Sequence, residues 1–389
     1  MAEEILRRNL GRAFDPGPDF PSRLLLSRTM AILDKEYAGG ARTIGQRAGQ
    51  GRFQNWARPR MRLVAVLLTV LIAVAATAVF ITSRERVAPA PIPAGKIIAT
   101  IKTGPRPEAV AVGSGSVWVA SCVNDSNFCQ TMVSRVDPAT NSVTATIPVT
   151  LSQGAIGLAA DDSGVWASDL LRGAVWRIDP HTNRVAVKVV TEHSPFGVAI
   201  GEGAVWVAST DGYLIRIDPD TNSVVATVHV TGAALNFVAI GAGSVWVHDA
   251  AGFVIRIDPK SNQVVSRIPV PINVVGLAID GSGRVWVDVI PGTDSCFASS
   301  GDVREIDPAT NLTLATVPLG HRPSGIVAAG GSIWVADQCD GTVTQINAST
   351  GESVGKPLAV GGEPRALAAG LGALWVNDYQ RGTLIRIHL

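Results

Sequence analysis

Short runs in which hydrophobic residues alternate with small or polar ones recur along the chain after residue 110, and a tryptophan lies at the centre of each. Seven runs share the pattern Val-Trp-Val or a close variant of it. Successive tryptophans are 48, 40, 40, 40, 48 and 41 residues apart. A period near forty built from short β-branched runs is typical of a β-propeller, in which each repeat forms one four-stranded blade. The tryptophans of the seven predicted blades are Trp118, Trp166, Trp206, Trp246, Trp286, Trp334 and Trp375.

A second signal, a hydrophobic residue followed by Asp-Pro and usually by Thr-Asn or Ser-Asn, comes after each of the first five tryptophans. In the third blade it separates two alternating runs, residues 215–217 and 224–228. Proline fixes φ, and Asp and Asn side chains bond the local backbone, so this motif predicts a tight turn. Each blade is therefore predicted to contain strand A, a glycine-rich turn, strand B with the tryptophan, a loop, strand C, the Asp-Pro turn and strand D.

The ring is predicted to close through a strand from the start of the domain. Residues 384–387 have the pattern of a strand C, and no strand D follows them in the sequence. Residues 96–101 resemble the strand D at 224–228, so we expect them to form the outer strand of blade seven. This arrangement leaves no open sheet edge. The predicted fold is an all-β, seven-bladed propeller with four-stranded blades over residues 96–389.

Blades one and five are longer than the others, and the added residues fall between strands B and C. From the tryptophan to the Asp of Asp-Pro there are 19 and 21 residues in these blades, against 12 or 13 in blades two to four. In an antiparallel meander these loops share a face with the blade-to-blade loops, and insertions on one face mark the working face.

All four cysteines lie at or in B–C loops, which fits disulfides in an oxidising compartment. Of the three possible pairings, the simplest keeps each partner in the same or an adjacent blade. Metal binding is the alternative, but the sequence has no CxxC motif or histidine-rich neighbour to support it. The predicted bonds are Cys122–Cys129 and Cys296–Cys339.

A different hydrophobic pattern precedes the repeats. Residues 63–82 form an uncharged run of 20 residues, long enough to cross a bilayer as a helix. The 62 residues before it fit poorly with a secretory signal peptide. Six arginines lie close before the run and only two after it, so the positive-inside rule places the N-terminus in the cytoplasm. We predict a single-pass protein of the cell membrane, with a cytoplasmic tail (1–62), an extracellular proline-rich spacer (83–95) and an extracellular propeller.

The cytoplasmic tail is predicted to carry a short helix and an arginine- and glycine-rich linker. Residues 22–37 read as an N-capped helix with one apolar face. That face either docks a cytoplasmic partner or rests on the membrane surface.

Charge excludes some functions of the extracellular part. Residues 83–389 carry 21 basic and 26 acidic residues, a balance of −5, which argues against a nucleic-acid partner. The phosphate-binding motif GxxxxGK[ST] is absent from the sequence, so ATP chemistry has no support either.

The blade-to-blade loops hold the candidate binding residues. In a closed ring, blades six, seven and one are neighbours, so Arg322, Arg365 and Arg106 are predicted to form one basic sector at the propeller mouth. Arginine suits carboxylate and phosphate groups, which predicts a small anionic ligand or an acidic protein partner there. Asn236, in another of these loops, is a further candidate contact. The tryptophans, one per blade, are interpreted as packing between blades, and no cofactor is predicted.

The run 205–228, which begins Val-Trp-Val-Ala-Ser-Thr and contains Ile-Arg-Ile-Asp-Pro-Asp-Thr-Asn, resembles bacterial YVTN-type propellers and the related streptogramin (virginiamycin B) lyase-like propellers. The resemblance extends over about residues 96–389 and implies the seven-bladed fold. For the lyases it also implies a Mg²⁺-dependent enzyme that opens a cyclic ester with central His and Glu residues.

This sequence departs from the lyase pattern. The residue three after each tryptophan is Ser, Asp or Val and never Glu, and the Pro-x-Gly turns carry Phe196 and Ser324 in place of His. A binding or interaction module is therefore the leading prediction, and a lyase that uses Mg²⁺ at the same mouth is the alternative. The remaining candidate acid–base residues are Glu192, His193 and His321.

Overall fold

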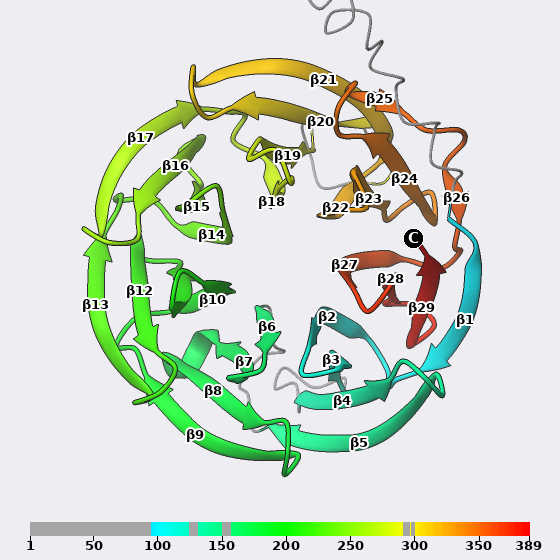
Figure 1. The fold of residues 1–389 in the computed structure, drawn as a ribbon, viewed down its shortest axis with the longest axis horizontal. Helices are drawn as coiled ribbons and strands as arrows, with labels where there is room; N and C mark the ends of the chain where they lie inside the picture. The colour runs from blue at the N-terminus through cyan, green and yellow to red at the C-terminus, as the bar shows by residue number, and fades with distance from the viewer. Residues whose placement is uncertain (1–94, 124–130, 150–156, 291–295, 297–299) are drawn as a thin grey trace, which may run out of the picture. The chain divides into compact units, whose positions relative to one another are not determined.

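Seven antiparallel sheets surround a central axis in the computed structural model, which describes residues 95–123, 131–149, 157–290, 296 and 300–389. Figure 1 shows them as the blades of a propeller, each with its first strand nearest the axis. This confirms the predicted fold class for the repeats. The cytoplasmic tail, the hydrophobic run and nearly all of the spacer lie outside the described residues. Within the described residues, no helix has the length and hydropathy needed to cross a membrane.

The strands follow the predicted order A, B, C, D in the first four blades. Blade one comprises β2 (Pro107–Gly113), β3 (Ser116–Cys122), β4 (Thr131–Asp137) and β5 (Ser142–Val149). Blade two comprises β6 (Leu158–Asp161), β7 (Gly164–Asp169), the 3₁₀ turn η1 (Leu170–Arg172), β8 (Ala174–Asp179) and β9 (Arg184–Val190). Blade three comprises β10 (Pro195–Gly201), β11 (Ala204–Ser209), β12 (Tyr213–Asp218) and β13 (Ser223–His229). Blade four comprises β14 (Leu235–Gly241), β15 (Ser244–Asp249), β16 (Phe253–Asp258) and β17 (Gln263–Pro269).

The last three blades contain the variations. Blade five comprises β18 (Val274–Ile279), β19 (Val285–Val289), β20 (Ser300–Asp307) and β21 (Leu312–His321). Blade six comprises β22 (Pro323–Ala329), β23 (Ser332–Asp337), β24 (Thr342–Asn347) and two short outer strands, β25 (Glu352–Ser353) and β26 (Leu358–Ala359). Blade seven comprises β27 (Pro364–Gly370), β28 (Ala373–Asp378), β29 (Thr383–His388) and β1 (Ile97–Lys102).

The core lies between neighbouring blades, and the repeated tryptophan is its largest member. All seven tryptophans of the repeat are at most 1% exposed. Trp206 of blade three packs in one cluster with Val245, Val247 and Ile255 of blade four. This confirms that the tryptophans pack blade against blade, because each fills the gap to the next sheet.

β1 closes the ring, as predicted. It pairs antiparallel with β29, with Ile101 opposite Leu384 and Lys102 opposite Thr383. Ile101 and Leu384 belong to one hydrophobic cluster that also contains Trp375. The first and last strands of the domain are therefore joined by both hydrogen bonds and packing, and residues 88–389 form a compact unit.

Blade six differs from the prediction of a single outer strand. Both β25 and β26 pair with β24, and Val354 still donates its N–H to Gln345 O at 2.8 Å, whereas residues 355–357 belong to neither outer strand. Gly355 has a φ of 68°, and Pro357 has no N–H to donate to the ladder. These two residues interrupt strand D of this blade.

In several blades an arginine on strand C forms hydrogen bonds to the Asp-Pro turn of the next blade. The sequence analysis did not predict this interaction. Arg386 of blade seven lies 5.0 Å over the ring of Trp375 and donates to Pro138 O and to Asn141 Oδ1 of blade one, at 2.5 and 2.9 Å. Asn141 sits in the Asp-Pro turn with a φ of 51°, so the turn motif also presents an acceptor to its neighbour. Equivalent bonds to the following blade are made by Arg135, Arg177 and Arg216.

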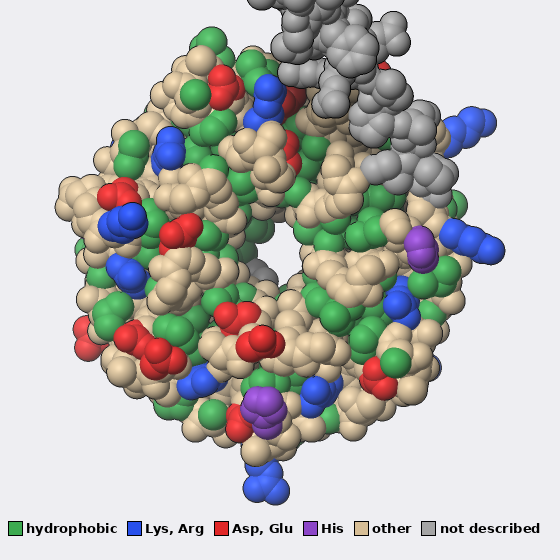
Figure 2. Space-filling view, in the orientation of Figure 1, with side chains coloured by type: hydrophobic (Ala, Val, Ile, Leu, Met, Phe, Trp, Pro, Cys, Tyr) green, Lys and Arg blue, Asp and Glu red, His purple; other side chains and the backbone are tan. Residues whose placement is uncertain are grey.

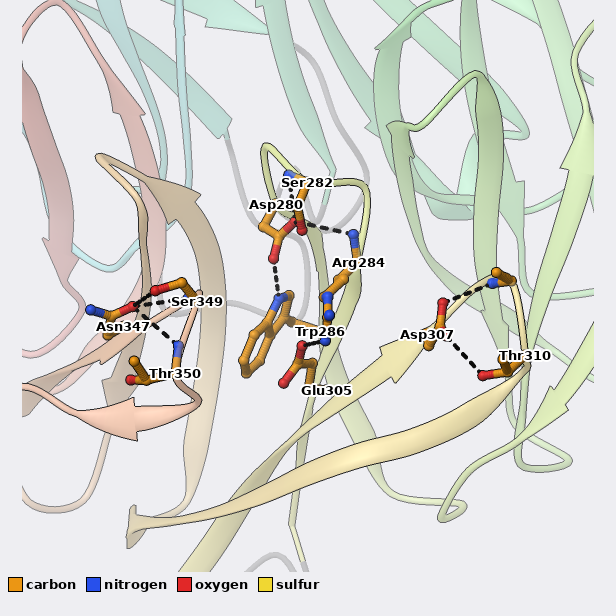
Figure 3. Close-up of polar contacts among 11 residues, drawn as sticks. Asp280, Ser282, Arg284, Trp286, Glu305, Asp307, Thr310, Asn347, Ser349 and Thr350 are labelled. Atoms are coloured by element: carbon orange, nitrogen blue, oxygen red, sulfur yellow. Dashed lines mark hydrogen bonds and ion pairs between the residues drawn. The ribbon is translucent and has the colours of Figure 1, made fainter. Parts of the chain in front are cut away.

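Blade five lacks this arginine at its contact with blade six (Figure 3); we call such a contact between neighbouring blades a seam. Glu305 takes the arginine's position and accepts a hydrogen bond from Arg284, the residue before β19. In blade four the strand C residue is the donor instead, since Arg256 donates to Ser244 at 2.8 Å. A cavity of about 460 Å³ lies beside this seam, lined mainly by glycine, alanine and serine. On the same blade, the Nε1–H of Trp286 donates to the Asp280 carboxylate at 2.9 Å.

The B–C loops and the blade-to-blade loops share one face, which we call the mouth face. The N–H groups of Gln338 and Tyr379, in B–C loops, donate to the carbonyls of Arg322 and Glu363 in blade-to-blade loops, at 3.0 and 2.9 Å. The long connections β3–β4 and β19–β20 are both B–C loops, as predicted.

One predicted disulfide, Cys296–Cys339, is confirmed and joins blades five and six with a Cα–Cα distance of 5.5 Å. Cys122 is also disulfide-bonded, but the predicted pairing involves Cys129, which lies outside the described residues.

Candidate ligand site at the propeller mouth

A cavity of about 490 Å³ lies on the axis, and it is lined by the first strand or the adjoining loop of every blade. Figure 2 shows the opening on the axis of the ring. This volume falls in the range of small-ligand pockets. Two of the predicted arginines, Arg322 and Arg365, line it, whereas Arg106 and Asn236 are not among the lining residues.

Backbone hydrogen bonds hold the arginine-bearing loops in place. Arg322 and Arg106 each precede the proline that begins a first strand, and they have φ angles of 55° and 46°. A side chain in this left-handed region costs about 1 kcal/mol. The carbonyl of Arg322 accepts from Gln338 N at 3.0 Å, and that of Arg106 from Cys122 N at 3.2 Å. These bonds, to the end of strand B in blade one and to the B–C loop in blade six, retain the left-handed conformation.

Contacts with neighbouring side chains orient Arg365. Its guanidinium lies 3.4 Å from the centroid of the Tyr379 ring, and its Nη2 donates to Glu363 at 3.3 Å. Gln338 donates to the same Glu363 carboxylate at 3.3 Å. A guanidinium has five N–H donors, so these contacts orient Arg365 and leave capacity for a bound anion.

Glu108 is a carboxylate on the cavity wall that the sequence reading did not single out. Burial raises its pKa, while the charges of Arg365 and Arg106 partly offset that effect. Arg106 thus acts on the site through Glu108, although its own side chain contacts Cys122 Sγ at 3.5 Å. The cavity wall therefore carries the carboxyl group of Glu108 as well as the predicted arginines, and the pKa of this carboxyl group is higher than that of a free glutamate.

The three candidate acid–base residues do not meet at the axis. His193 is bound to Asp211 at 2.7 Å and stacks on Tyr213, with ring centroids 4.1 Å apart. His321 is bound to Asp340 at 2.9 Å, in blade six. None of Glu192, His193 or His321 lines the axial cavity.

Four blades have a buried polar residue at the position two after the tryptophan, and two of these residues, His248 and Asp288, are ionisable. His248 is fully buried, and burial lowers its pKa to about 4. Asp288 is also fully buried, and neither of its carboxylate oxygens has a hydrogen-bond partner among the described residues. Burial, with a smaller contribution from Asp337, raises the pKa of Asp288 to about 7.

Glu108, which was missed, has the same position in its repeat as the predicted Arg365. Each follows the proline that starts a first strand, as does the cavity-lining Phe196. Asp288 stands in a buried register where three other blades have alanine. Aligning the seven repeats position by position exposes both sets.

The lyase alternative implies side chains that could hold Mg²⁺ at the mouth. No group of three or more His, Cys, Asp or Glu side chains in that part of the chain is close enough to hold a metal ion. The candidates His193 and His321 are each bound to an aspartate of their own.

The fold and the axial cavity together define a seven-bladed β-propeller with a ligand-sized mouth, and solved structures share this fold. Hydrazine synthase of Kuenenia stuttgartiensis is similar with a TM-score of 0.62 and 15% identity, covering 73% of this chain and 96% of that chain. Two structures of virginiamycin B lyase from Staphylococcus aureus, one an inactive variant with quinupristin and one selenomethionine-substituted, give TM-scores of 0.57 and 0.59. Each is 15% identical and covers 76% of this chain and at least 98% of its own.

No family model matches the sequence, and no curated protein matches it. At 15% identity the structural likeness establishes the fold alone.

Proposed function

We propose that this chain is a binding module that takes a small anionic ligand in the axial cavity of its propeller. The observation that carries the proposal is the pair Arg322 and Arg365 on the wall of a cavity of about 490 Å³. A charge-assisted hydrogen bond to arginine contributes about 1.5–3 kcal/mol, which makes these two residues the main determinants of affinity.

The site favours binding over catalysis. A lyase at this mouth requires acid–base groups in reach of one bound molecule, and Glu192, His193 and His321 do not line the cavity. An acidic loop of a protein partner is the second candidate ligand, because it offers the arginines the same carboxylate chemistry.

We further propose that the propeller is held outside the cell membrane by a single helix at residues 63–82, as the charge asymmetry of its flanks indicates. Binding at the mouth would then report an extracellular ligand, and residues 22–37 would contact a cytoplasmic partner. Reporter fusions at either end of the chain test this orientation, which predicts a cytoplasmic N-terminus.

Calorimetric titration with benzoate tests the binding site. The double variant Arg322→Ala/Arg365→Ala should bind benzoate at least about tenfold more weakly than the wild type. Arg184→Ala, on the exposed outer strand β9, is the matched control and should bind normally. Equal affinity of the double variant and the wild type would exclude the mouth as the anion site.

A further inference from the structure

The axial cavity has two chemically different halves. The polar lining residues come from blades six, seven and one, which are consecutive in the ring. They are Arg322, Ser324 and Gln338 of blade six, Arg365 of blade seven and Glu108 of blade one. The side chains that line it from blades two to five are all apolar. Figure 1 shows the first strands of these two groups facing each other across the axis, with β10 and β14 opposite β27.

The apolar half is built around two phenylalanines. Phe196 of β10 and Phe237 of β14 form an edge-to-face pair, with ring centroids 6.2 Å apart and an interplanar angle of 89°. Leu158, Val275 and Leu277 extend this surface on either side. Such a surface gains from contact with the apolar part of a ligand roughly in proportion to the area removed from water.

The polar half carries more positive than negative charge toward a ligand. Glu363 is already engaged by Arg365 and Gln338, and the pKa of Glu108 is raised by burial. A purely apolar ligand would remove water from the arginines without offering them an acceptor in return, which disfavours it relative to a carboxylate.

We infer that the ligand is a small amphipathic carboxylic acid, whose carboxylate pairs with Arg322 and Arg365 and whose apolar body lies against Phe196 and Phe237. This inference rests on the proposed binding function and specifies the chemical class that the mouth accepts. A compact polyanion would leave the phenylalanine half without contact, and an alcohol of the same length would offer the arginine half no negative charge.

Calorimetric titration with hexanoate, octanoate, decanoate and decanol tests this inference, on the full-length chain and in parallel on residues 88–389. Each added pair of methylene groups should tighten binding by about tenfold. Decanol should bind at least about tenfold more weakly than decanoate, because it lacks the charge.

Two variants separate the halves of the site. Arg365→Ala should remove most of the preference for decanoate over decanol and keep the dependence on chain length. Phe237→Ala should reduce the dependence on chain length and keep the preference for the acid. Phe237→Leu retains apolar volume and should restore the chain-length dependence, which distinguishes lost contact from misfolding.

The outcomes distinguish this inference from the function on which it rests. Equal affinity for hexanoate and decanoate, with binding still lost in Arg322→Ala/Arg365→Ala, would overturn the amphipathic ligand and retain an anion site. Carboxylate binding that is absent, or indifferent to both arginines, would overturn both.

Discussion

Replacing Asp288 by asparagine should stabilise the propeller at neutral and alkaline pH. Asp288 is fully buried without a hydrogen-bond partner in the described part of the chain, and its pKa is raised from 3.8 to about 7. The difference is about 3 units, and each unit corresponds to about 1.36 kcal/mol, so the ionised side chain costs at most about 4 kcal/mol. Because the folded state holds the proton more tightly, stability is intact below about pH 4 and falls until about pH 7.

Blade seven shows what an asparagine does in this register. Asn377 Oδ1 accepts from the N–H groups of Ala366 and Arg365, at 2.6 and 3.2 Å, and its Nδ2 donates to Pro107 O at 2.7 Å. These partners lie on the first strand of its own blade and of the next. An asparagine at 288 has the equivalent strands β18 and β22 beside it, so its amide should be satisfied where the carboxylate is not.

Urea denaturation of the wild type and Asp288→Asn at several pH values measures the effect. The variant should gain up to about 4 kcal/mol at pH 8, and the gain should shrink steadily toward pH 4. Asp220→Asn, on an exposed turn, should change stability by no more than about 0.5 kcal/mol at any pH. A loss of stability at pH 8, or a gain that does not vary with pH, would refute the assigned cost of burying this carboxylate.

Three further predictions concern the seams between blades, each measured by urea denaturation. Arg386→Ala should lower the free energy of unfolding by about 1.5–3 kcal/mol, because it removes charge-assisted bonds from blade seven to blade one; an unchanged midpoint would contradict this. Replacing both Cys296 and Cys339 by serine should cost about 4 kcal/mol, from the loop-closure entropy of a separation of 43 residues, and no loss would show that the bond adds nothing. The pair Arg284→Ser/Glu305→Arg recreates the arrangement of blade four and should stabilise by about 1 kcal/mol; destabilisation would mean that the seam cannot accept the guanidinium.

The fold could be predicted from the repeat, whereas the side-chain interactions between blades could not. Tryptophan spacing predicted seven blades, and the similarity of residues 96–101 to other outer strands predicted closure by β1, since both depend on local alternation. The arginine bonds were missed because Arg386 and its acceptor Asn141 are 245 residues apart, and each looks like an ordinary strand or turn residue alone. The interruption of blade six depends on Pro357 and Gly355, whose effect was not considered.

The site was predictable only in part, because ring closure determines which loops meet but not which side chains turn inward. Adjacent blades bring Arg322 and Arg365 to one cavity, as expected, while Arg106 acts through Glu108. Sequence spacing could not show that His193 and His321 each pair with an aspartate. The two partners, Asp211 and Asp340, lie in the B–C loops of blades three and six. Those pairs depend on the packing of one loop against another.

A crystal structure with bound 4-bromobenzoate tests the central claim most directly, because the bromine can be located by its anomalous scattering. We predict one bromine peak in the axial cavity, on the side of Phe196 and Phe237, with the carboxylate on Arg322 and Arg365. Full occupancy at another surface, with the axial cavity containing only water, would contradict the assignment of the mouth as the binding site.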